Sequence, residues 1–344
     1  MTLAFITGLE GETLSDREAR FLREAAPAGL ILFARNCVGP EQIRRLVGEA
    51  REASGQGDDF LVLIDQEGGR VQRLRPPLGR ALPPADAYAC LYCEDEDSAR
   101  DAAFLSARLL ADDLKDLGIN TNCAPVLDVP VPGAHDIIGD RAYGRTPGQV
   151  ARLGRAVAEG LMAGGVLPVV KHIPGHGRAT ADSHLALPVV DAPRDVLDAT
   201  DFAPFKALAD MPAAMTAHVV FTAVDGDAPA STSRRVTQEV IRGAIGFDGL
   251  LMSDDLSMKA LSGPMSARAE AVLAAGSDLA LHCSGDFAEM EAVAAAVPPL
   301  AGDGLRRFRA AVEIFGGSEP YDSERAQREL ARALGTTGRA PESV

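Results

Sequence analysis

A histidine-rich segment has the clearest capacity for chemistry in this chain. From Lys171 to His184 it reads KHIPGHGRATADSH and holds three of the six histidines, beside glycine and proline. This composition is typical of a loop whose backbone can approach a ligand. In Asp182-Ser-His184 the carboxylate can bond one ring nitrogen, orient the imidazole and leave the other nitrogen for proton transfer. The alternative, a surface histidine beside an aspartate, is disfavoured by the histidine-rich context.

Two adjacent aspartates form a second candidate group. Asp254 and Asp255 come directly after the apolar run Leu250–Ser253. A carboxylate at the end of a buried strand can serve as a nucleophile, a base or a metal ligand. Aspartate is also a good helix cap, so we expect one of the pair to cap a following helix and the other to be available for chemistry.

The segment Asp65–Arg73, DQEGGRVQR, is a candidate binding segment. Its two glycines permit a tight turn that folds Arg73 back toward Asp65. An aspartate at a strand end can accept hydrogen bonds from two vicinal hydroxyl groups. The glycine pair is a weak indication of a phosphate loop, because the chain has no GxGxxG or GxxxxGK[ST] motif. Arg141, in DRAYG, would by itself be interpreted as a surface arginine.

Composition and charge exclude several classes of protein. The 344 residues carry a formal net charge of −15, and 47% are hydrophobic, as in an ordinary globular protein. The acidic balance argues against nucleic acid or an anionic membrane surface as the partner. Every apolar run is far shorter than the roughly 20 residues of a membrane span, and we expect no signal peptide. The five cysteines are scattered and fit a cytoplasmic location.

Eight short apolar runs alternate with helical patterns along the chain. Each run is too short for a helix and too continuously apolar for a half-exposed strand, as expected of parallel strands buried on both faces. Eight such strands alternating with helices predict an α/β fold, a closed (β/α)8 TIM-type barrel. The runs are Leu3–Ile6, Leu30–Phe33, Leu61–Ile64, Ile119–Cys123, Val166–Val170, Ala213–Ala217, Leu250–Ser253 and Asp278–Leu281.

The chain shows no linker or repeat that would divide it. We therefore expect a single barrel domain over residues 1–335, with long loops after the strands and a helical tail after Asp286. Residues 336–344 are expected to form a flexible C-terminal tail. The expected helices of the barrel cover residues 15–26, 98–117, 146–163, 195–209, 237–244 and 266–275.

Polar or ionisable side chains stand at the ends of these runs. Barrels of this class carry their active sites at the carboxyl ends of the strands, so these side chains should gather on one face. Packing alone would not place an ionisable residue after one buried strand after another. The strand-end residues are Arg35, Asn36, Asp65, Asp128, Lys171, His172, His218, Asp254 and His282.

Together these segments resemble glycoside hydrolase family 3, specifically its single-barrel β-N-acetylglucosaminidases of peptidoglycan recycling. The resemblance runs in the family's order from about residue 29 to residue 285, most of the chain. The Asp-Ser-His segment distinguishes these enzymes from members that use a glutamate on another domain. Ala142-Tyr143 and Ile173 depart from the usual Ser-Phe and Phe without removing a polar group. The matching segments are GLILFARN, IDQEGGRVQRL, APVLDV, DRAYG, KHIPGHG, DSH and MSDDLSM.

The resemblance implies a role for each candidate residue. Asp254 would be the nucleophile that forms a covalent glycosyl-enzyme, and His184 the general acid/base with Asp182 as its dyad partner. The implied activity is a retaining exo-β-N-acetylglucosaminidase (β-N-acetylhexosaminidase) acting on N-acetylglucosamine-1,6-anhydro-N-acetylmuramic acid and its peptides. We expect no cofactor, no metal, a small carbohydrate as the only partner, and a monomer. The residues implied to bind the sugar are Asp65, Arg73, Arg141, Lys171 and His172.

The residues themselves are consistent with this chemistry, but alternatives stay open. Retaining glycosidases need an anionic nucleophile and an acid/base near the departing oxygen, and imidazole, with an ordinary pKa near 6.5, can fill the second role. One alternative is a phosphorylase, which would use phosphate in place of water as the acceptor. A histidine acid/base would permit this, because it does not repel phosphate as a carboxylate would. A sugar-binding barrel without catalysis is disfavoured by the presence of both candidate catalytic groups.

A metal-dependent hydrolase on the same barrel is a further alternative. It would use ligand-type side chains of the same loops, although no HExxH or tight H-x-H cluster occurs. Cys90 and Cys93 form only a lone CxxC, so we expect no structural zinc. The ligand-type residues are His172, His176, Asp182, His184 and Asp254.

Overall fold

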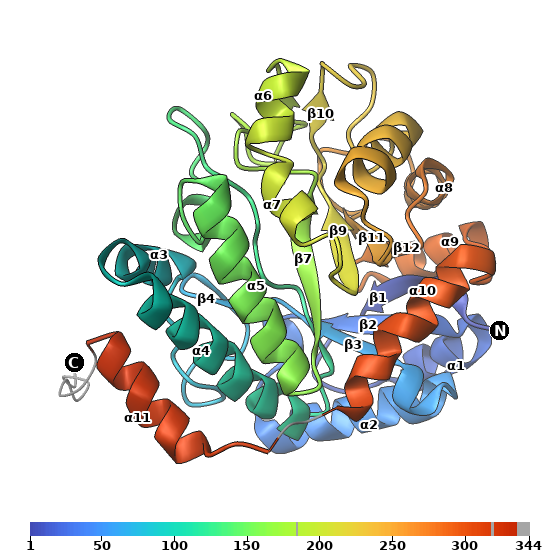
Figure 1. Cartoon of the computed structure of the whole chain (residues 1–344). Helices are drawn as coiled ribbons and strands as arrows, with labels where there is room; N and C mark the ends of the chain where they lie inside the picture. Colours follow the sequence, from blue (N-terminus) through green and yellow to red (C-terminus); the bar gives the residue numbers. More distant parts are fainter. Residues whose placement is uncertain (184, 318–319, 336–344) are drawn as a thin grey trace.

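The computed structural model of the chain describes residues 1–183, 185–317 and 320–335. Eight parallel strands close into a barrel in the order β1-β12-β11-β9-β7-β6-β3-β2, and helices surround it (Figure 1). The predicted (β/α)8 barrel is confirmed, and each of the eight apolar runs overlaps one barrel strand. These strands are β1 Leu3–Gly8, β2 Pro27–Leu32, β3 Leu61–Ile64, β6 Thr121–Asn122, β7 Leu167–Ile173, β9 Ala213–Thr216, β11 Leu250–Asp255 and β12 Leu279–His282.

One barrel strand extends well past its apolar run. The run predicts that β7 ends at Val170, whereas the strand continues to Ile173. The ladder continues because neighbouring segments supply partners: the N–H of Leu127 donates to the carbonyl of Lys171 at 2.7 Å, and that of Ala217 donates to Ile173 at 2.8 Å. Lys171 is therefore part of strand β7 and does not belong to the loop that follows it.

Two small sheets and a ring of helices complete the fold. In the loop after β3, β4 (Gln66–Gly68) pairs antiparallel with β5 (Val71–Gln72). Elsewhere, β8 (Val189–Val190) in the loop after β7 pairs with β10 (Val220–Phe221) in the loop after β9. A π-helix spans Val236–Ile245. The α-helices are α1 Asp16–Ala25, α2 Pro40–Ser54, α3 Ala85–Glu94, α4 Glu96–Asp116, α5 Pro147–Ala163, α6 Arg194–Ala199, α7 Ala203–Ala207, α8 Met265–Ala275, α9 Phe287–Ala296, α10 Gly302–Val312 and α11 Ser323–Ala333.

The prediction of one helix over residues 195–209 is wrong. The chain instead forms α6, which ends at Ala199, and α7, which begins at Ala203. Pro204 has no N–H to donate to a preceding turn, so a continuous helix would lose a hydrogen bond at this point. Between the two helices Asp201 is buried and accepts a hydrogen bond from Arg178 at 2.9 Å, an ion pair that holds the break in place.

Helix α2 has clear sequence signals, although the sequence analysis does not name it. Gly39 precedes its first residue, Pro40, and Gly55 ends it with a positive φ of 68°. Proline at the first helical position and glycine just past the last are the usual signals of helix start and stop. Its buried residues are Ile43, Leu46, Val47, Ala50, Ala53 and Ser54, an amphipathic spacing.

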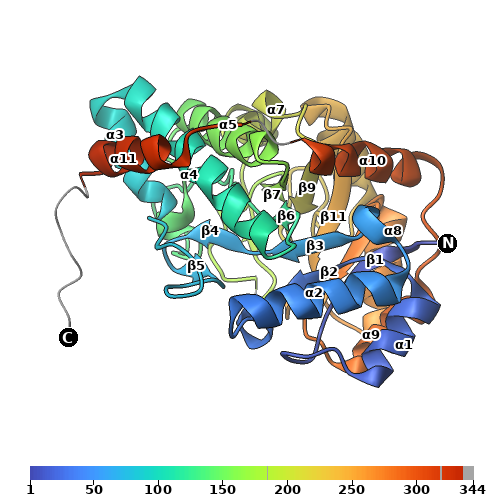
Figure 2. The ribbon, with the colours of Figure 1, turned by 90° about the horizontal axis from the view of Figure 1, so that it is seen from below.

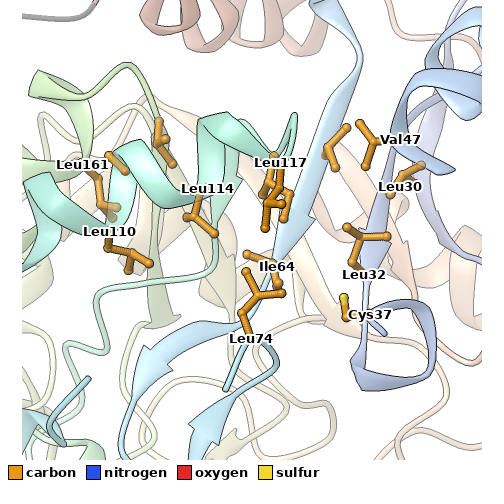
Figure 3. Close-up of a cluster of buried hydrophobic side chains, with 14 of the residues drawn as sticks. Leu30, Leu32, Cys37, Val47, Ile64, Leu74, Leu110, Leu114, Leu117 and Leu161 are labelled. Carbon is orange, nitrogen blue, oxygen red and sulfur yellow. The ribbon is translucent and has the colours of Figure 1, made fainter. Parts of the chain in front are cut away.

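The hydrophobic core has an inner and an outer part. Figure 3 shows the outer part, where Leu30 of β2 and Ile64 of β3 are buried in one cluster with Val47 of α2 and Leu114 of α4. The inner part fills the barrel with side chains from alternate strand positions. The two parts share the strands, so each strand is buried on both faces as its apolar run predicts.

Helix α10 closes the amino-terminal end of the barrel. Phe308 and Ala311 belong to the same buried cluster as the inward-facing strand residues. Arg307 fixes the helix to segments that precede two strands, with Nη1 at 3.0 Å from Asp278 and Nη2 at 2.8 Å from Asp248. Helix α11 lies along α4 on the outside (Figure 2). With one end covered, a site inside this barrel opens at the carboxyl ends of the strands.

Close contact between β2 and β3 makes Gly29 a sensitive position. A Cβ added there would lie 2.4 Å from the carbonyl oxygen of Leu61, which is backbone and cannot rotate away. We predict that Gly29→Ala lowers the free energy of unfolding by about 1–3 kcal/mol, measured from the denaturant midpoint.

The matched control is Gly48→Ala on the exposed face of α2, where an added Cβ meets no atom within 4 Å. This variant should gain about 0.5–1 kcal/mol because alanine favours a helix over glycine. Equal midpoints for the two variants would contradict the assignment of a tight β2–β3 contact.

Candidate active site

The carboxyl ends of the barrel strands surround a cavity of about 330 Å³. Its floor is apolar and comes from the inner core of the barrel, with Ile31, Met215 and Leu281 among the lining residues. Charged side chains make up much of the rest of the lining. Six of the site residues predicted from the sequence line this one cavity: Asp65, Arg73, Arg141, Lys171, His172 and Asp254.

Strand alternation explains why three of these side chains point inward. Successive residues of a strand face opposite sides, so a residue two positions past an inward-facing residue also faces inward. Each strand here presents two apolar side chains to the inner core and then one charged side chain to the cavity. The three series are Leu61, Leu63 and Asp65; Leu167, Val169 and Lys171; and Leu250, Met252 and Asp254.

Two irregularities in the barrel ladder add further polar groups. His172 and Asp255 also line the cavity, next to Lys171 and Asp254, which regular alternation would not allow. The register of β7 against β9 shifts just after Lys171, and that of β11 against β12 shifts ahead of Asp255. Irregularities of this kind re-aim side chains beside active sites.

A chain of ion pairs lines one wall of the cavity. The Asp65 carboxylate accepts from Lys171 Nζ at 2.9 Å through Oδ1 and from Arg73 Nη2 at 2.9 Å through Oδ2. Lys171 Nζ also lies 2.6 Å from Glu67 Oε1. The Arg141 guanidinium donates to both oxygens of Glu67, at 2.8 and 2.9 Å. Cation and anion thus alternate along five side chains from Arg73 to Arg141.

This pairing keeps the buried charges ionised. Burial alone would raise the pKa of Glu67, but Arg141 and Lys171 outweigh it and lower that pKa to about 2. Burial would likewise raise the pKa of Asp65, but Lys171 and Arg73 outweigh burial and hold that pKa far below its ordinary value. Burial would lower the pKa of Lys171, yet the two carboxylates raise it. An ionised Asp65 can only accept hydrogen bonds, so a hydroxyl group that meets it must donate.

A buried aspartate holds two histidines of the KHIPGHG segment. Asp128 has its Oδ2 2.7 Å from His172 Nδ1, and its Oδ1 accepts the backbone N–H of His176 at 2.6 Å. Burial would raise the pKa of Asp128, but the nearby His172 lowers it below the ordinary value. With Nδ1 engaged by the carboxylate, Nε2 is the nitrogen of His172 left for contacts in the cavity.

The two adjacent aspartates have different partners. Asp255 Oδ1 accepts the backbone N–H groups of Ser257 at 2.9 Å and Cys283 at 3.2 Å, and burial raises the pKa of this carboxyl group. Asp254 lines the cavity, and its Oδ1 accepts the N–H of Asp255 at 2.8 Å. The prediction that one of the pair caps a helix is wrong, because the next helix begins only at Met265. Asp255 instead stabilises the turn after β11.

The Asp-Ser-His segment is only partly described. Ser183 lines the cavity, whereas Asp182 is not among the lining residues. His184 lies outside the described residues, so its pairing with Asp182 stays a prediction.

Glu67 is the principal residue that the sequence analysis misses. It stands two positions after Asp65, so the alternation that turns Asp65 inward carries Glu67 to the same side. A buried carboxylate needs a cation, which is the signal that could have linked it to Arg141. Arg141 itself is no surface arginine, since only 11% of its side chain is exposed.

Metal and membrane features can be assessed over residues 1–183, 185–317 and 320–335. Within these residues no three His, Cys, Asp or Glu side chains are grouped so that they could hold a metal ion. Cys90 and Cys93 are exposed thiols on α3. In the same part of the chain, no helix has both the length and the apolar character needed to cross a membrane.

Comparison with known proteins identifies the family. Residues 4–305 match the glycosyl hydrolase family 3 N terminal domain. The chain belongs to glycosyl hydrolase family 3. The resemblance seen in the motifs is thereby confirmed, and so is the expectation that the protein is a glycoside hydrolase.

Family 3 relatives match most of the chain. A β-hexosaminidase of Alkalilimnicola ehrlichii is 40% identical over 281 residues, which cover 80% of this chain and 79% of the relative. A β-hexosaminidase of Methylococcus capsulatus is 41% identical over 280 residues, with 80% and 81% covered. NagZ from Neisseria gonorrhoeae, solved in complex with N-trifluoroacetyl-D-glucosamine, has a TM-score of 0.85 at 31% identity, with 97% of this chain and 98% of that chain covered.

One family 3 neighbour is a longer protein. The β-N-acetylglucosaminidase of Paenibacillus sp. has a TM-score of 0.84 and is 32% identical, covering 96% of this chain and 66% of its own. The barrel of this chain therefore corresponds to about two thirds of that family 3 enzyme.

The low pKa of Glu67 in this family 3 barrel predicts a specific pH dependence. Its folded pKa of about 2 lies below the ordinary 4.5, so its stabilising contribution is complete above pH 4.5 and is lost as the pH falls toward 2. Glu67→Gln should be less stable than the parent at pH 7 by about 3 kcal/mol, and this difference in the free energy of unfolding should shrink on acidification. Urea unfolding between pH 7 and pH 3.5 measures it.

Glu49→Gln, on the exposed side of α2, removes the same charge from the surface and is the control. It should leave the unfolding profile close to that of the parent at every pH. Parallel profiles for the parent and Glu67→Gln would show that the buried carboxylate is not held ionised by its partners.

Proposed function

We propose that the protein is a retaining exo-β-N-acetylglucosaminidase, which releases terminal β-linked N-acetylglucosamine from peptidoglycan fragments through a covalent glycosyl-enzyme. The observation that carries the proposal is the position of Asp254, whose carboxylate lines the same cavity as the ion-pair chain from Arg73 to Arg141. The relatives support it, since they are named β-hexosaminidases and one solved neighbour holds an N-acylated glucosamine.

The ion-pair chain offers fixed hydrogen-bonding groups to one sugar ring. Asp65 would accept from hydroxyl groups, while Arg73, Arg141 and Lys171 would donate, with His172 Nε2 as a further contact. Asp65, Arg73, Arg141 and Lys171 already have opposite charges beside them. A sugar can therefore add contacts and displace water without leaving a bare charge buried.

The shape of the cavity supports action at a chain end. Ile31, Met215 and Leu281 close it from below, and the barrel beneath them is filled with apolar side chains. A terminal unit can enter end-on until it meets this floor, and a cavity that is closed at its base suits such a unit. This favours release of the non-reducing sugar over cleavage within a chain.

The proposed reaction has two steps. Asp254 attacks the anomeric carbon while the protonated ring of His184 gives its proton to the departing oxygen, and the glycosidic bond breaks. Water then adds to the anomeric carbon, passes its proton to His184, and the bond to Asp254 breaks. Asp182 would favour the charged form of the His184 ring and orient it.

One partly exposed arginine at the cavity supports an acidic fragment as the substrate. Arg70 lines the cavity and has 42% of its side chain exposed, with Asp140 as its partner at 2.8 Å. Muramic acid and its peptide stems carry carboxylates that such a cation would attract. We propose that one domain, residues 1–335, carries the whole reaction as a cytoplasmic monomer with water as the acceptor and no cofactor.

The first test concerns Asp254. Asp254→Ala should reduce hydrolysis of an aryl β-N-acetylglucosaminide by at least about 10³-fold, the scale of losing a covalent catalyst. A 5-fluoro glycosyl fluoride of N-acetylglucosamine should label the parent on the peptide that contains Asp254, as read by mass spectrometry. Asp58→Ala, an exposed aspartate ahead of β3, is the control and should keep parent activity. A label on any other peptide would refute the assignment of the nucleophile.

The second test concerns His184. His184→Ala should lower kcat/KM for the natural disaccharide by about 10²–10⁴-fold, since that leaving group needs a proton. A dinitrophenyl glycoside, whose leaving group departs as an anion, should lose far less. Equal losses on both substrates would exclude His184 as the acid.

A further inference from the structure

Ser183 is buried in a loop whose other described residues nearby are exposed or partly exposed. Among the described residues from 180 to 187, Ser183 is the buried one, with 3% of its surface exposed, whereas Leu185 is 67% exposed. A polar side chain that turns inward from an exposed loop needs a hydrogen-bond partner to offset its lost hydration. Ser183 therefore marks a point at which the loop is attached to the barrel.

Two separate segments hold Ser183. Its hydroxyl group lies 3.0 Å from Nε2 of His176, and its carbonyl oxygen accepts the N–H of Ala260 at 3.2 Å. His176 belongs to the loop after β7, and Ala260 to the turn that follows β11, the strand that carries the proposed nucleophile. The attachment thus ties the loop to both sides of the cavity.

His176 is itself rigidly placed. It is 3% exposed, its backbone N–H donates to Asp128 at 2.6 Å, and its ring meets that of His172 edge-on at a centroid distance of 5.8 Å. Burial lowers the pKa of His176 to about 4, so the ring is neutral at pH 7. Its other nitrogen, Nδ1, is buried without a hydrogen-bond partner in the part of the chain that the structure describes. Among these described groups, Ser183 is therefore the hydrogen-bond partner of the ring.

We propose that the His176–Ser183 hydrogen bond positions the acid/base segment over the cavity. This inference rests on the proposed function, in which Asp182 and His184 form the acid/base dyad. Ser183 is joined covalently to both, so fixing its hydroxyl group limits where the two side chains can reach. His176 and Ser183 are then positioning residues that act on proton transfer.

The test uses leaving groups of different acidity. For the natural disaccharide, Ser183→Ala should lower kcat by about tenfold or more, which is part of the 10²–10⁴-fold rate gain that a general acid supplies. The change in KM should be smaller than the change in kcat. For a dinitrophenyl glycoside the loss in kcat/KM, which reports only the first step, should stay within about threefold, because that leaving group needs no acid. Thr180→Ala removes a hydroxyl group from an exposed position of the same loop and should change neither rate.

A second variant and a double-mutant cycle separate positioning from a general structural effect. Ser183→Cys replaces the hydroxyl group by a somewhat larger thiol that keeps a weak hydrogen-bonding capacity, and should be faster on the disaccharide than Ser183→Ala. His176→Phe, which keeps a ring and removes the hydrogen-bonding nitrogens, combined with Ser183→Ala should lose little beyond the larger single loss, since both remove one interaction. Equal loss on both substrates, fully additive effects, or an unchanged Ser183→Ala enzyme would overturn the inference.

The experiment also separates this inference from the proposed function. Labelling of Asp254 by the fluoro glycoside and kcat/KM for the dinitrophenyl glycoside report the nucleophile and the sugar site without the acid. If both persist in Ser183→Ala while its disaccharide rate equals that of the parent, only the positioning role fails. If the parent itself is neither labelled nor active, the proposed function fails and this inference with it.

Discussion

Two carboxylates and three cations share the carboxyl end of the barrel, and no member of that group could be buried there alone. Removing one partner of a buried pair typically costs about 3–5 kcal/mol, because the remaining charge is uncompensated. Here the pairs join β3, the hairpin after it, β7 and the loop that carries Arg141. The loops that form the cavity wall are thus held in place by the same charges that would receive a sugar, so binding and architecture depend on one set of contacts.

The same constraint explains how neighbouring aspartates come to differ. Asp254 and Asp255 are chemically identical, and the ladder irregularity in β11 brings both to the cavity. The backbone N–H groups of Ser257 and Cys283 occupy Asp255, which therefore serves the turn. A division of labour between like residues can arise from backbone donors alone, without any change of side chain.

The sequence predicts the barrel and the inward direction of its charged residues, because both follow from local periodicity. Runs such as Leu61–Ile64 have the length and character of strands buried on both faces, and Asp65 continues the alternation. Which charged side chains pair across the cavity cannot be predicted from local periodicity. Glu67 and Arg141 stand 74 residues apart, and their meeting depends on the path of a long loop. Pro204 is a sequence signal for the break between α6 and α7, but the helical periodicity on both sides of it favours a single helix.

Closure of the barrel has a consequence for folding of the chain during its synthesis. β1 pairs with β12, the N–H of Ala4 donates to Pro298, and that of Leu300 donates to Thr2. The first strand therefore has to wait for partners that are made almost 300 residues later. During synthesis its edge stays open, and a nascent chain of this kind needs protection from pairing with other exposed strands until the last part of the barrel leaves the ribosome.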